Sequence, residues 1–369
     1  MGSIGDIMNK PSIINDMVRR FAPSDTRYGQ IIRFVLKFIH PSFSCLGAYH
    51  EMKYNMAVRS LLSVDVLNEH IVNIKALAES EQSPKLFYII RREADAGLFS
   101  FVHTSFAHLM YALTKGMIPV IDMQNYRSVY IEEDKLGKEN AWEYFFKQPC
   151  GYGLDDARRS EVKHGYLHSW QSILPLTILQ SRDKRYNEFF EIWSIIYRHF
   201  FQLSDNASKY INEEYNRLIK PGMRVIGVKC RGTDYTMLRP RNHPIQPEVE
   251  DVIAKVREVM EAWNCDYVYI SSEERKTVEH FEQAFPGKVL YVSQMFYDDV
   301  DYINTYITRA NFGRENDAYL RGLEYLSSII ILARCTSAIL SLCGGSATAM
   351  YINGGKYENT YIFDLGLYP

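Results

Sequence analysis

A short apolar run near the middle of the chain ends abruptly in polar residues. The segment Arg224–Tyr235 reads RVIGVKCRGTDY. A continuous β-branched run of this kind is typical of a strand that is buried on both faces of a parallel sheet. Such a strand delivers Arg231 to the carboxyl edge of the sheet, where open α/β folds bind nucleotides. The sequence therefore predicts an α/β fold with an anion site at Arg231.

Short strand patterns alternate with longer helical patterns along most of the chain, which indicates parallel sheets covered by helices on both faces. The expected strands are Leu86–Ile90, Ile118–Asp122, Val225–Lys229, Tyr267–Ser271, Val289–Val292, Ala338–Ser341 and Tyr361–Phe363. A helix-rich stretch, Leu167–Leu218, carries no strand pattern, and Lys220-Pro221-Gly222 interrupts the chain directly after it. We therefore expect two domains, at residues 1–220 and 221–369.

Composition excludes several classes of protein. With 369 residues, 47% of them apolar, and a formal net charge of −2, the chain can form two cores and lacks the basic surplus of a nucleic-acid-binding protein. Its six cysteines are scattered singly, and no apolar run reaches the length of a membrane span, so we expect a cytoplasmic protein. Arg19–Phe21 and Arg33–His40 mix basic and apolar residues, which suits either peripheral contact with the inner membrane face or plain amphipathic core helices.

The residues after the central strand resemble a known motif. From Arg231 the chain continues through Asp234 to His243-Pro244-Ile245. This order resembles the first shared motif of the GDP-fucose-dependent fucosyltransferases, commonly His-x-Arg-Arg-x-Asp, a superfamily that includes bacterial α-1,2/α-1,6 and protein O-fucosyltransferases. The resemblance covers the second expected domain well and a glycine loop near Gly97 more loosely.

The resemblance implies a GT-B glycosyltransferase, with two Rossmann-like parallel-sheet domains facing a cleft. It also implies an inverting, metal-independent reaction that moves fucose or a related sugar from a GDP-sugar to a glycan acceptor. A bacterial-type enzyme of surface polysaccharide or glycoconjugate synthesis is the expected biological setting. The GDP-sugar is then a substrate, and neither a cofactor nor a metal ion is expected.

The diphosphate of such a donor needs positive charge and backbone donors, because cleavage of the sugar bond adds negative charge to it. The planar fork of Arg231 suits this task, and the resemblance assigns Arg231 to the diphosphate. The alternative is that Arg231 simply pairs with Asp234. Cys343–Met350 resembles the last motif of the family, in which amides and small hydroxyls hold the diphosphate. The residues that it implicates here are Gly344, Gly345, Ser346 and Thr348.

Other residues are expected around the ribose or base. Leu320-Arg321-Gly322 resembles a family stretch that enters a helix near the nucleotide, and its nearest acids are Asp317 and Glu324. A solvated helical face is the alternative for both acids. Ser271-Ser272-Glu273 stands at the end of the expected strand Tyr267–Ser271, so it reaches the same carboxyl edge as Arg231, and Ser272 is the candidate contact with the donor.

The sequence departs from the family at two places on the donor side. Lys229 stands where the motif begins with histidine, and Gly232 stands where it has a second arginine. Lys229 could replace part of the lost positive charge, if the strand stays regular as far as Arg231. Gly232 allows a sharp turn or a close approach of the backbone to the phosphates.

The acceptor side is expected on the first domain. The loop around Gly97 follows the strand Leu86–Ile90 and leads into an expected helix, Ser105–Lys115. Asp95 on this loop is the acid best placed to remove a proton from an acceptor hydroxyl. His103 is the alternative base or an acceptor-binding residue, although a structural role is more common for such a histidine.

The identity of the base stays open between several residues. Arg239 occupies the position of a glutamate found in core fucosyltransferases, and an arginine cannot act as a base. Either Asp95 or Asp234 acts as the base, or the reaction relies on departure of the leaving group. Arg239 and Arg241 would then suit an anionic acceptor, with plain solvated side chains as the alternative.

Two other classes of function have less support in the sequence. His164 and His168 have a ligand-like spacing without a third ligand, and Asp298–Asp301 lies away from any expected strand edge, so no metal site is predicted. A kinase-type phosphate loop and a dinucleotide fingerprint are both missing from the sequence. The rival hypothesis is a non-catalytic glycan- or nucleotide-binding protein that kept the Arg231 pocket.

Overall fold

The computed structural model describes most of the chain. The described ranges are residues 61, 63–91, 96–158, 162–166, 186–231, 236, 238–241, 243–298 and 313–369, with backbone alone at 162–166 and 186–188. The chain divides into two compact units, Met1–Ser60 and Leu61–Pro369, and every described residue belongs to the second. The basic and apolar segments expected at a membrane surface, Arg19–Phe21 and Arg33–His40, lie outside the described residues.

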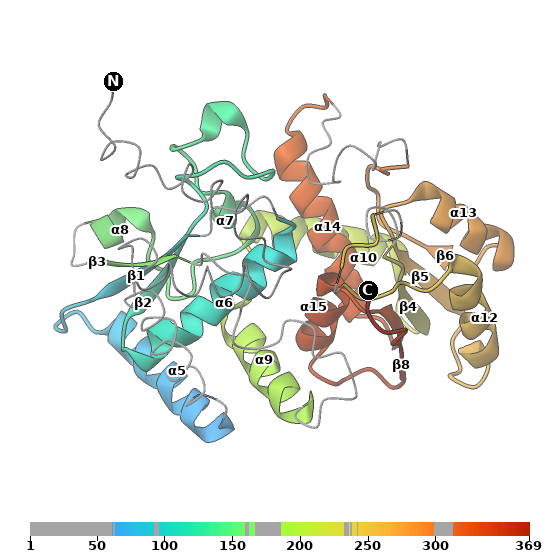
Figure 1. The fold of residues 1–369 in the computed structure, drawn as a ribbon, viewed down its shortest axis with the longest axis horizontal. Helices are drawn as coiled ribbons and strands as arrows, with labels where there is room; N and C mark the ends of the chain where they lie inside the picture. The colour runs from blue at the N-terminus through green and yellow to red at the C-terminus, as the bar shows by residue number, and fades with distance from the viewer. Residues whose placement is uncertain are drawn as a thin grey trace, which may run out of the picture. The chain divides into compact units, whose positions relative to one another are not determined.

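The first sheet has three parallel strands in the order β2-β1-β3 (Figure 1). The strands are β1 (Phe87–Arg91), β2 (Ile118–Asp122) and β3 (Val162–Tyr166). In the register of the sheet, Phe87 lies opposite both Ile118 and Val162. The helical elements of this part are α5 (Val64–Glu79), α6 (Leu98–Thr114), the 3-10 turn η2 (Glu133–Lys135), α7 (Ala141–Phe145) and α8 (Leu154–Arg158).

The second sheet has five parallel strands in the order β6-β5-β4-β7-β8. The strands are β4 (Val225–Lys229), β5 (Tyr267–Ser271), β6 (Val289–Leu290), β7 (Ser337–Ser341) and β8 (Thr360–Phe363). The chain moves outward from β4 through β5 to β6, then returns to place β7 on the other side of β4. This reversal is the topological switch point at which open α/β sheets bind ligands, and it lies between the carboxyl ends of β4 and β7.

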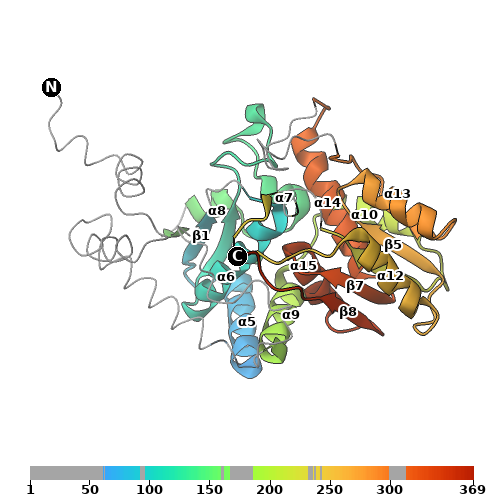
Figure 2. The same cartoon turned by 45° about the vertical axis from the view of Figure 1, so that its right-hand side comes forward.

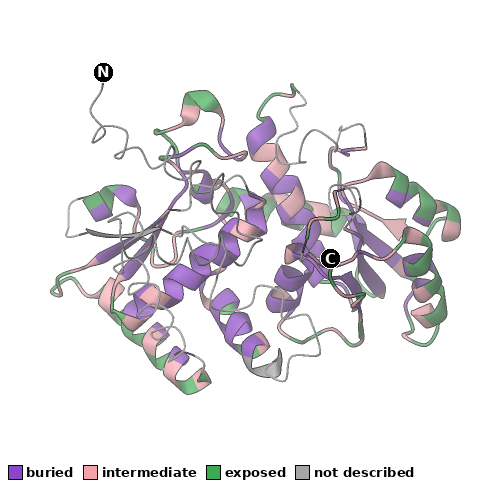
Figure 3. Ribbon diagram, in the orientation of Figure 1, coloured by how far each residue is buried: buried purple, intermediate pink, exposed green. Residues whose placement is uncertain are grey.

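Helices cover both faces of the second sheet and join it to the rest of the unit. They are α9 (Tyr186–Phe200), α10 (Asp205–Leu218), α12 (Val249–Met260), α13 (Arg275–Ala284), α14 (Asp317–Ala333) and α15 (Gly344–Asn353). Helix α9 packs on α15 and α10 packs on α14, as the two views agree (Figures 1 and 2). Helices α6 and α14 are buried along most of their length, whereas α12 and α13 expose one face to solvent (Figure 3).

The predicted fold class is confirmed: the chain is α/β, with two separate parallel sheets. Every predicted strand is present, and β2, β4 and β5 have the predicted bounds. Strand β3 was not predicted, and α6 begins at Leu98 instead of Ser105. The sheets are separated in sequence between the end of α10 at Leu218 and the start of β4 at Val225. The division into domains at residue 220 itself stays a prediction.

Candidate functional site at the carboxyl edge of the second sheet

Lys229 ends β4 with its side chain inside the protein. The side chain is 1% exposed, and its Nζ donates to the carbonyls of Cys230 (3.3 Å) and Ser271 (3.2 Å) and to Oε2 of Glu273 (3.2 Å). These acceptors account for the N–H bonds of the ammonium group. Lys229 therefore adds positive charge to the sheet edge without an N–H left over to donate to a bound anion.

Glu273 links Lys229 to Arg231. Its Oε2 accepts from Lys229, and its Oε1 lies 3.4 Å from NH1 of Arg231. Burial alone would favour the neutral acid, but the nearby charges of Lys229 and Arg231 outweigh it and hold the pKa of Glu273 below its usual value. The group therefore contains two cations and one carboxylate, and its net charge is positive.

The start of α15 lies beside this group. Its N-cap, Cys343, gives no side-chain cap to the first amides of the helix, which belong to Gly344, Gly345 and Ser346. A Cβ added to Gly345 would lie 3.5 Å from Cε of Lys229 and only 2.9 Å from the hydroxyl of Tyr325. A glycine is thus required for this close approach. Uncapped amides at a helix start, together with the helix dipole, favour a bound anion.

The start of α6 reaches the same place from the first sheet. Its N-cap is Gly97, and the ring of Phe99 lies 5.0 Å from the ring of Tyr325 in an edge-on contact. The Cβ of Phe99 is also 4.0 Å from where a Cβ on Gly344 would stand. The start of α6 after Gly97 and the glycine turn of the second half are therefore neighbours.

Tyr130 connects the start of α6 to the cations. Burial raises the pKa of Tyr130, while a hydrogen bond with the Leu98 backbone and the charges of Arg321 and Arg231 act in the opposite direction. The phenol is therefore neutral and in the electrostatic range of both arginines. Tyr130 and Tyr325 were not among the predicted site residues, whereas Glu273 belongs to the stretch Ser271-Ser272-Glu273 that the sequence predicts at this carboxyl edge.

His103 and Thr348 lie in the core, not at the sheet edge. Nε2 of His103 lies 3.3 Å from Oγ1 of Thr348, which also lies 3.2 Å from the hydroxyl of Tyr197. His103 is 2% exposed, and the rings of Trp193 and Tyr351 surround it. Burial lowers the pKa of His103 to about 3, so the imidazole is neutral. The predicted contact of His103 with an acceptor and of Thr348 with a donor would need both side chains to leave this buried pair.

Asp317 and Glu324 are held by arginines. Arg314 donates to Oδ1 of Asp317 (2.7 Å) and binds both oxygens of Glu324 (2.7 and 3.0 Å). Arg321 donates to Oδ2 of Asp317, and the amide of Met295 donates to Glu324. These acids thus join the start of α14 to the loop after β6, and neither is a solvated acid on a helix face.

The remaining predicted residues fall into three groups. Ser272 is buried, and its Oγ accepts from the amide of Glu274 at 3.2 Å, so it caps the turn after β5. Arg239 and Arg241 are exposed, and Arg239 has a positive φ of 42°. Both proposed bases, Asp95 and Asp234, lie outside the described residues, as does Gly232.

The loop that carries the two arginines is fixed to the sheet edge at its far end. The amide of Ile245 donates to Gly366, and the amide of Tyr368 donates to His243, so the C-terminal residues pair with this loop. Nε2 of Gln246 then donates to the carbonyl of Leu342 at 3.1 Å. Leu342 lies two residues before Gly344, so the far end of the loop is held next to the glycine turn.

Metal ligands are not clustered in the part of the chain that is described. Asp298 instead caps α13, since it accepts from the amides of Arg275 (2.6 Å) and Lys276 (3.0 Å). Its neighbours, residues 299–301, and His168 lie outside the described residues, and only the backbone of His164 is described. Among the described helices, none combines the length and the apolar character needed to cross a membrane.

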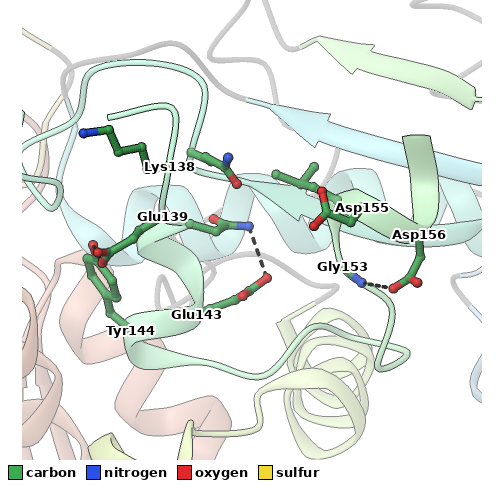
Figure 4. Close-up of a pocket in the computed structure, with 10 residues that line it drawn as sticks. Lys138, Glu139, Glu143, Tyr144, Gly153, Asp155 and Asp156 are labelled. Atoms are coloured by element: carbon green, nitrogen blue, oxygen red, sulfur yellow. Dashed lines mark hydrogen bonds between the residues drawn. The ribbon is translucent and has the colours of Figure 1, made fainter. Parts of the chain in front are cut away.

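A cavity of about 540 Å³ lies in the first half, and its lining residues fall between Gln124 and Asp156 (Figure 4). Its charged lining residues are Lys138, Glu139, Glu143, Asp155 and Asp156. The acids already accept from neighbours, such as Tyr144 for Glu139 (2.6 Å) and the Gly153 amide for Asp156 (2.9 Å). Its negative charge would repel a diphosphate, so this cavity is not suited to the donor.

No protein-family model and no curated protein sequence matches the chain. Among solved structures, it is similar to the NodZ α-1,6-fucosyltransferase soaked with GDP-fucose, with a TM-score of 0.48 and 18% identity over 76% of this chain and 96% of that one. POFUT1 in its apo form gives a TM-score of 0.43 and 11% identity, over 77% and 99%. A variant of FUT1 from Arabidopsis thaliana, in complex with GDP, gives 0.44 and 8%, over 86% and 79%. The fucosyltransferase NodZ from Bradyrhizobium gives a TM-score of 0.45 and 16% identity, over 73% and 93%.

Proposed function

We propose that the chain is an inverting glycosyltransferase of GT-B type that uses GDP-fucose or a closely related GDP-sugar and needs no metal ion. One observation carries the proposal: Arg231 and the uncapped start of α15 lie together at the switch point of the second sheet. A helix start beside an arginine is suited to a diphosphate, and the switch point is where such folds bind nucleotides.

The charge of the site suits the departure of GDP. Cleavage of the sugar bond places new negative charge on the diphosphate, which Arg231 and the amides of Gly344 and Gly345 would stabilise. Lys229 would contribute through its charge, and Gly97 through the helix start that it caps. Ser272, Asp317 and Glu324 belong to segments that would surround the ribose and base, where the arginine-linked acids fix the shape of the pocket.

The acceptor would enter from the side of the first half. Asp95, on the loop before Gly97, or Asp234, after Arg231, would remove the proton of the acceptor hydroxyl as the oxygen attacks the anomeric carbon opposite GDP. Exposed Arg239 and Arg241 would bind an anionic group of the acceptor, such as a phosphate or an acidic sugar. His103 would serve this site by holding Thr348 and α15 in place.

The product would be a fucosylated glycan of a surface polysaccharide or glycoconjugate, made at the cytoplasmic face of the membrane. The rival function is binding of a nucleotide or glycan without turnover. It shares the anion site and differs only in the chemistry after binding.

Calorimetry with GDP, followed by release of GDP from GDP-fucose with and without acceptor, tests the proposal. We expect GDP to bind and GDP-fucose to be hydrolysed slowly, in EDTA as well as in magnesium. Binding of GDP without any release from GDP-fucose would favour the non-catalytic rival. A protein that binds no GDP, or whose turnover EDTA abolishes and manganese restores, would contradict the proposal.

A further inference from the structure

We infer that Glu273 is a positioning residue, which fixes the guanidinium of Arg231 toward the diphosphate by joining it to the buried ammonium of Lys229. The inference rests on the proposed function and adds a residue to that site.

Lys229 is the fixed end of this arrangement. Its ammonium is bonded to two main-chain carbonyls, those of Cys230 and Ser271, which belong to the ends of neighbouring strands. The side chain is 1% exposed, and Gly345 lies against its Cε. The position of Nζ is therefore set by the sheet, and with it the position of Oε2 of Glu273.

Arg231 is the end that meets the ligand. It directly follows the buried Cys230, its side chain is 14% exposed, and the Oε1 of Glu273 is 3.4 Å from its NH1. A guanidinium carries N–H donors on more than one edge, so an arginine can contact a carboxylate and a phosphate together. A long arginine that is already oriented loses less rotamer freedom when the ligand binds, which strengthens binding and places charge for the transition state.

A role of Glu273 as a plain counter-ion of Lys229 predicts a different result. If Glu273 only neutralised buried Lys229, removing both charges together would restore stability, and GDP would bind as it does to Lys229→Met alone. If Glu273 orients Arg231, removing both charges restores the fold but takes away the contact of the guanidinium with Glu273, so GDP would bind more weakly than to Lys229→Met. A Lys229→Met/Glu273→Gln double variant separates these two roles.

We expect Glu273→Gln to lower the unfolding midpoint, because it leaves the Lys229 charge buried without a partner, and to weaken GDP binding by about tenfold or more. The double variant should recover the midpoint of unfolding and bind GDP more weakly than Lys229→Met alone, which lacks only the charge of Lys229. Glu274→Gln is the matched control, since it changes the adjacent acid, whose Oε2 accepts from Thr277 on α13. The control should bind GDP as the wild type does.

A double-mutant cycle with Arg231→Ala gives the second test, again read by GDP calorimetry. If Glu273 acts through Arg231, then Arg231→Ala/Glu273→Gln should bind GDP about as weakly as Arg231→Ala alone. Additive losses would overturn the inference, as would a Lys229→Met/Glu273→Gln variant with wild-type GDP affinity. If the wild type binds GDP and Glu273→Gln binds it equally well, the inference about Glu273 is wrong and the proposed function still stands. A wild type that binds no GDP overturns the proposed function and this inference with it.

Discussion

The hydroxyl of Thr348 on α15 lies 3.3 Å from Nε2 of His103 on α6. The two residues are 245 positions apart, and their contact joins the helix that follows the first glycine loop to the helix that follows the glycine turn. Both helix starts face the anion site, so this buried pair fixes their relative position.

Thr348→Val should destabilise the protein, because it keeps the shape of the side chain and removes the partner of two buried groups, His103 and Tyr197. A loss of about 1–3 kcal/mol is expected in the free energy of unfolding. Urea unfolding measures it, and Thr348→Ser is the matched control that keeps the hydroxyl. If the valine variant were as stable as the wild type, the pair would have no structural role.

Acid should destabilise the protein from about pH 6.5 downward. Burial lowers the pKa of His103 to about 3 and that of His108 to about 4, so both are neutral in the folded chain, whereas the unfolded chain binds protons on them below their usual pKa. The unfolded state then binds more protons than the folded state. The free energy of unfolding therefore decreases as the pH is lowered, by at most about 1.4 kcal/mol per pH unit for each histidine.

Urea unfolding at pH 7.5, 6.5 and 5.5 measures this dependence, above the range in which carboxylates such as Glu273 begin to titrate. His103→Gln should give a shallower pH dependence than the wild type, whatever its absolute stability. An unchanged slope in this variant would show that His103 is not the neutral buried group described here.

Gly345→Ala should disrupt the site because the added methyl group would contact neighbouring side chains too closely. The new methyl would lie 2.9 Å from the hydroxyl of Tyr325 and 3.0 Å from Cδ1 of Ile329, so one of these side chains must move. A loss of roughly 1–3 kcal/mol in unfolding free energy is expected, as for other overpacked cores. Gly344→Ala is the control, because its methyl would meet only Cβ of Phe99, at 4.0 Å. Thermal unfolding of both variants checks the contrast, and equal midpoints would contradict it.

The strands were predictable because their apolar runs are short, β-branched and bounded by polar residues. Strands β2, β4 and β5 follow this pattern and have the expected bounds. Strand β3 reads VKHGY, and its lysine, histidine and glycine hide the pattern. Helix α6 begins earlier than expected because it is buried on nearly all sides, so its first turns show no amphipathic period.

The site was predictable only as far as the strand ends. Arg231, Ser272 and the glycine turn follow predicted strands, and parallel strands bring their carboxyl ends to one edge. The partners across that edge depend on register, which the sequence does not reveal. Lys229 lies opposite Ser271 in the sheet, and this register alone brings Glu273 to Lys229 and Arg231. The contact between His103 and Thr348 depends in the same way on tertiary structure.

Arg231→Ala should weaken donor binding and transfer together, because it removes a charge-assisted contact with the diphosphate. The expected loss in the transition state is on the order of 2–4 kcal/mol. Arg231→Lys should recover little, since an ammonium lacks the planar fork and the edge that faces Glu273. Steady-state kinetics with GDP-fucose tests both variants, and turnover of the alanine variant within about threefold of wild type would remove Arg231 from the proposed mechanism.

Asp95→Asn should abolish sugar transfer while it spares donor binding. Asp95 itself lies outside the described residues. Before it, β1 ends at Arg91, at the carboxyl edge of the first sheet, and after it α6 begins at Leu98, close to the glycine turn. Asparagine keeps the shape of the side chain and cannot take up a proton, so transfer should fall by about 10²–10⁴-fold, the usual contribution of a general base.

GDP affinity of the Asp95→Asn variant, measured by calorimetry, should stay close to that of the wild type, because in the proposed function Arg231 and the start of α15 would bind the diphosphate. Asp234→Asn is the matched variant on the donor side, directly after the strand that carries Arg231. Normal transfer by Asp95→Asn together with a collapse in Asp234→Asn would assign the base to Asp234. Loss of GDP binding in Asp95→Asn would instead show that the loop before Gly97 holds the donor, and normal transfer by both variants would mean that departure of GDP, and not proton removal, limits the reaction.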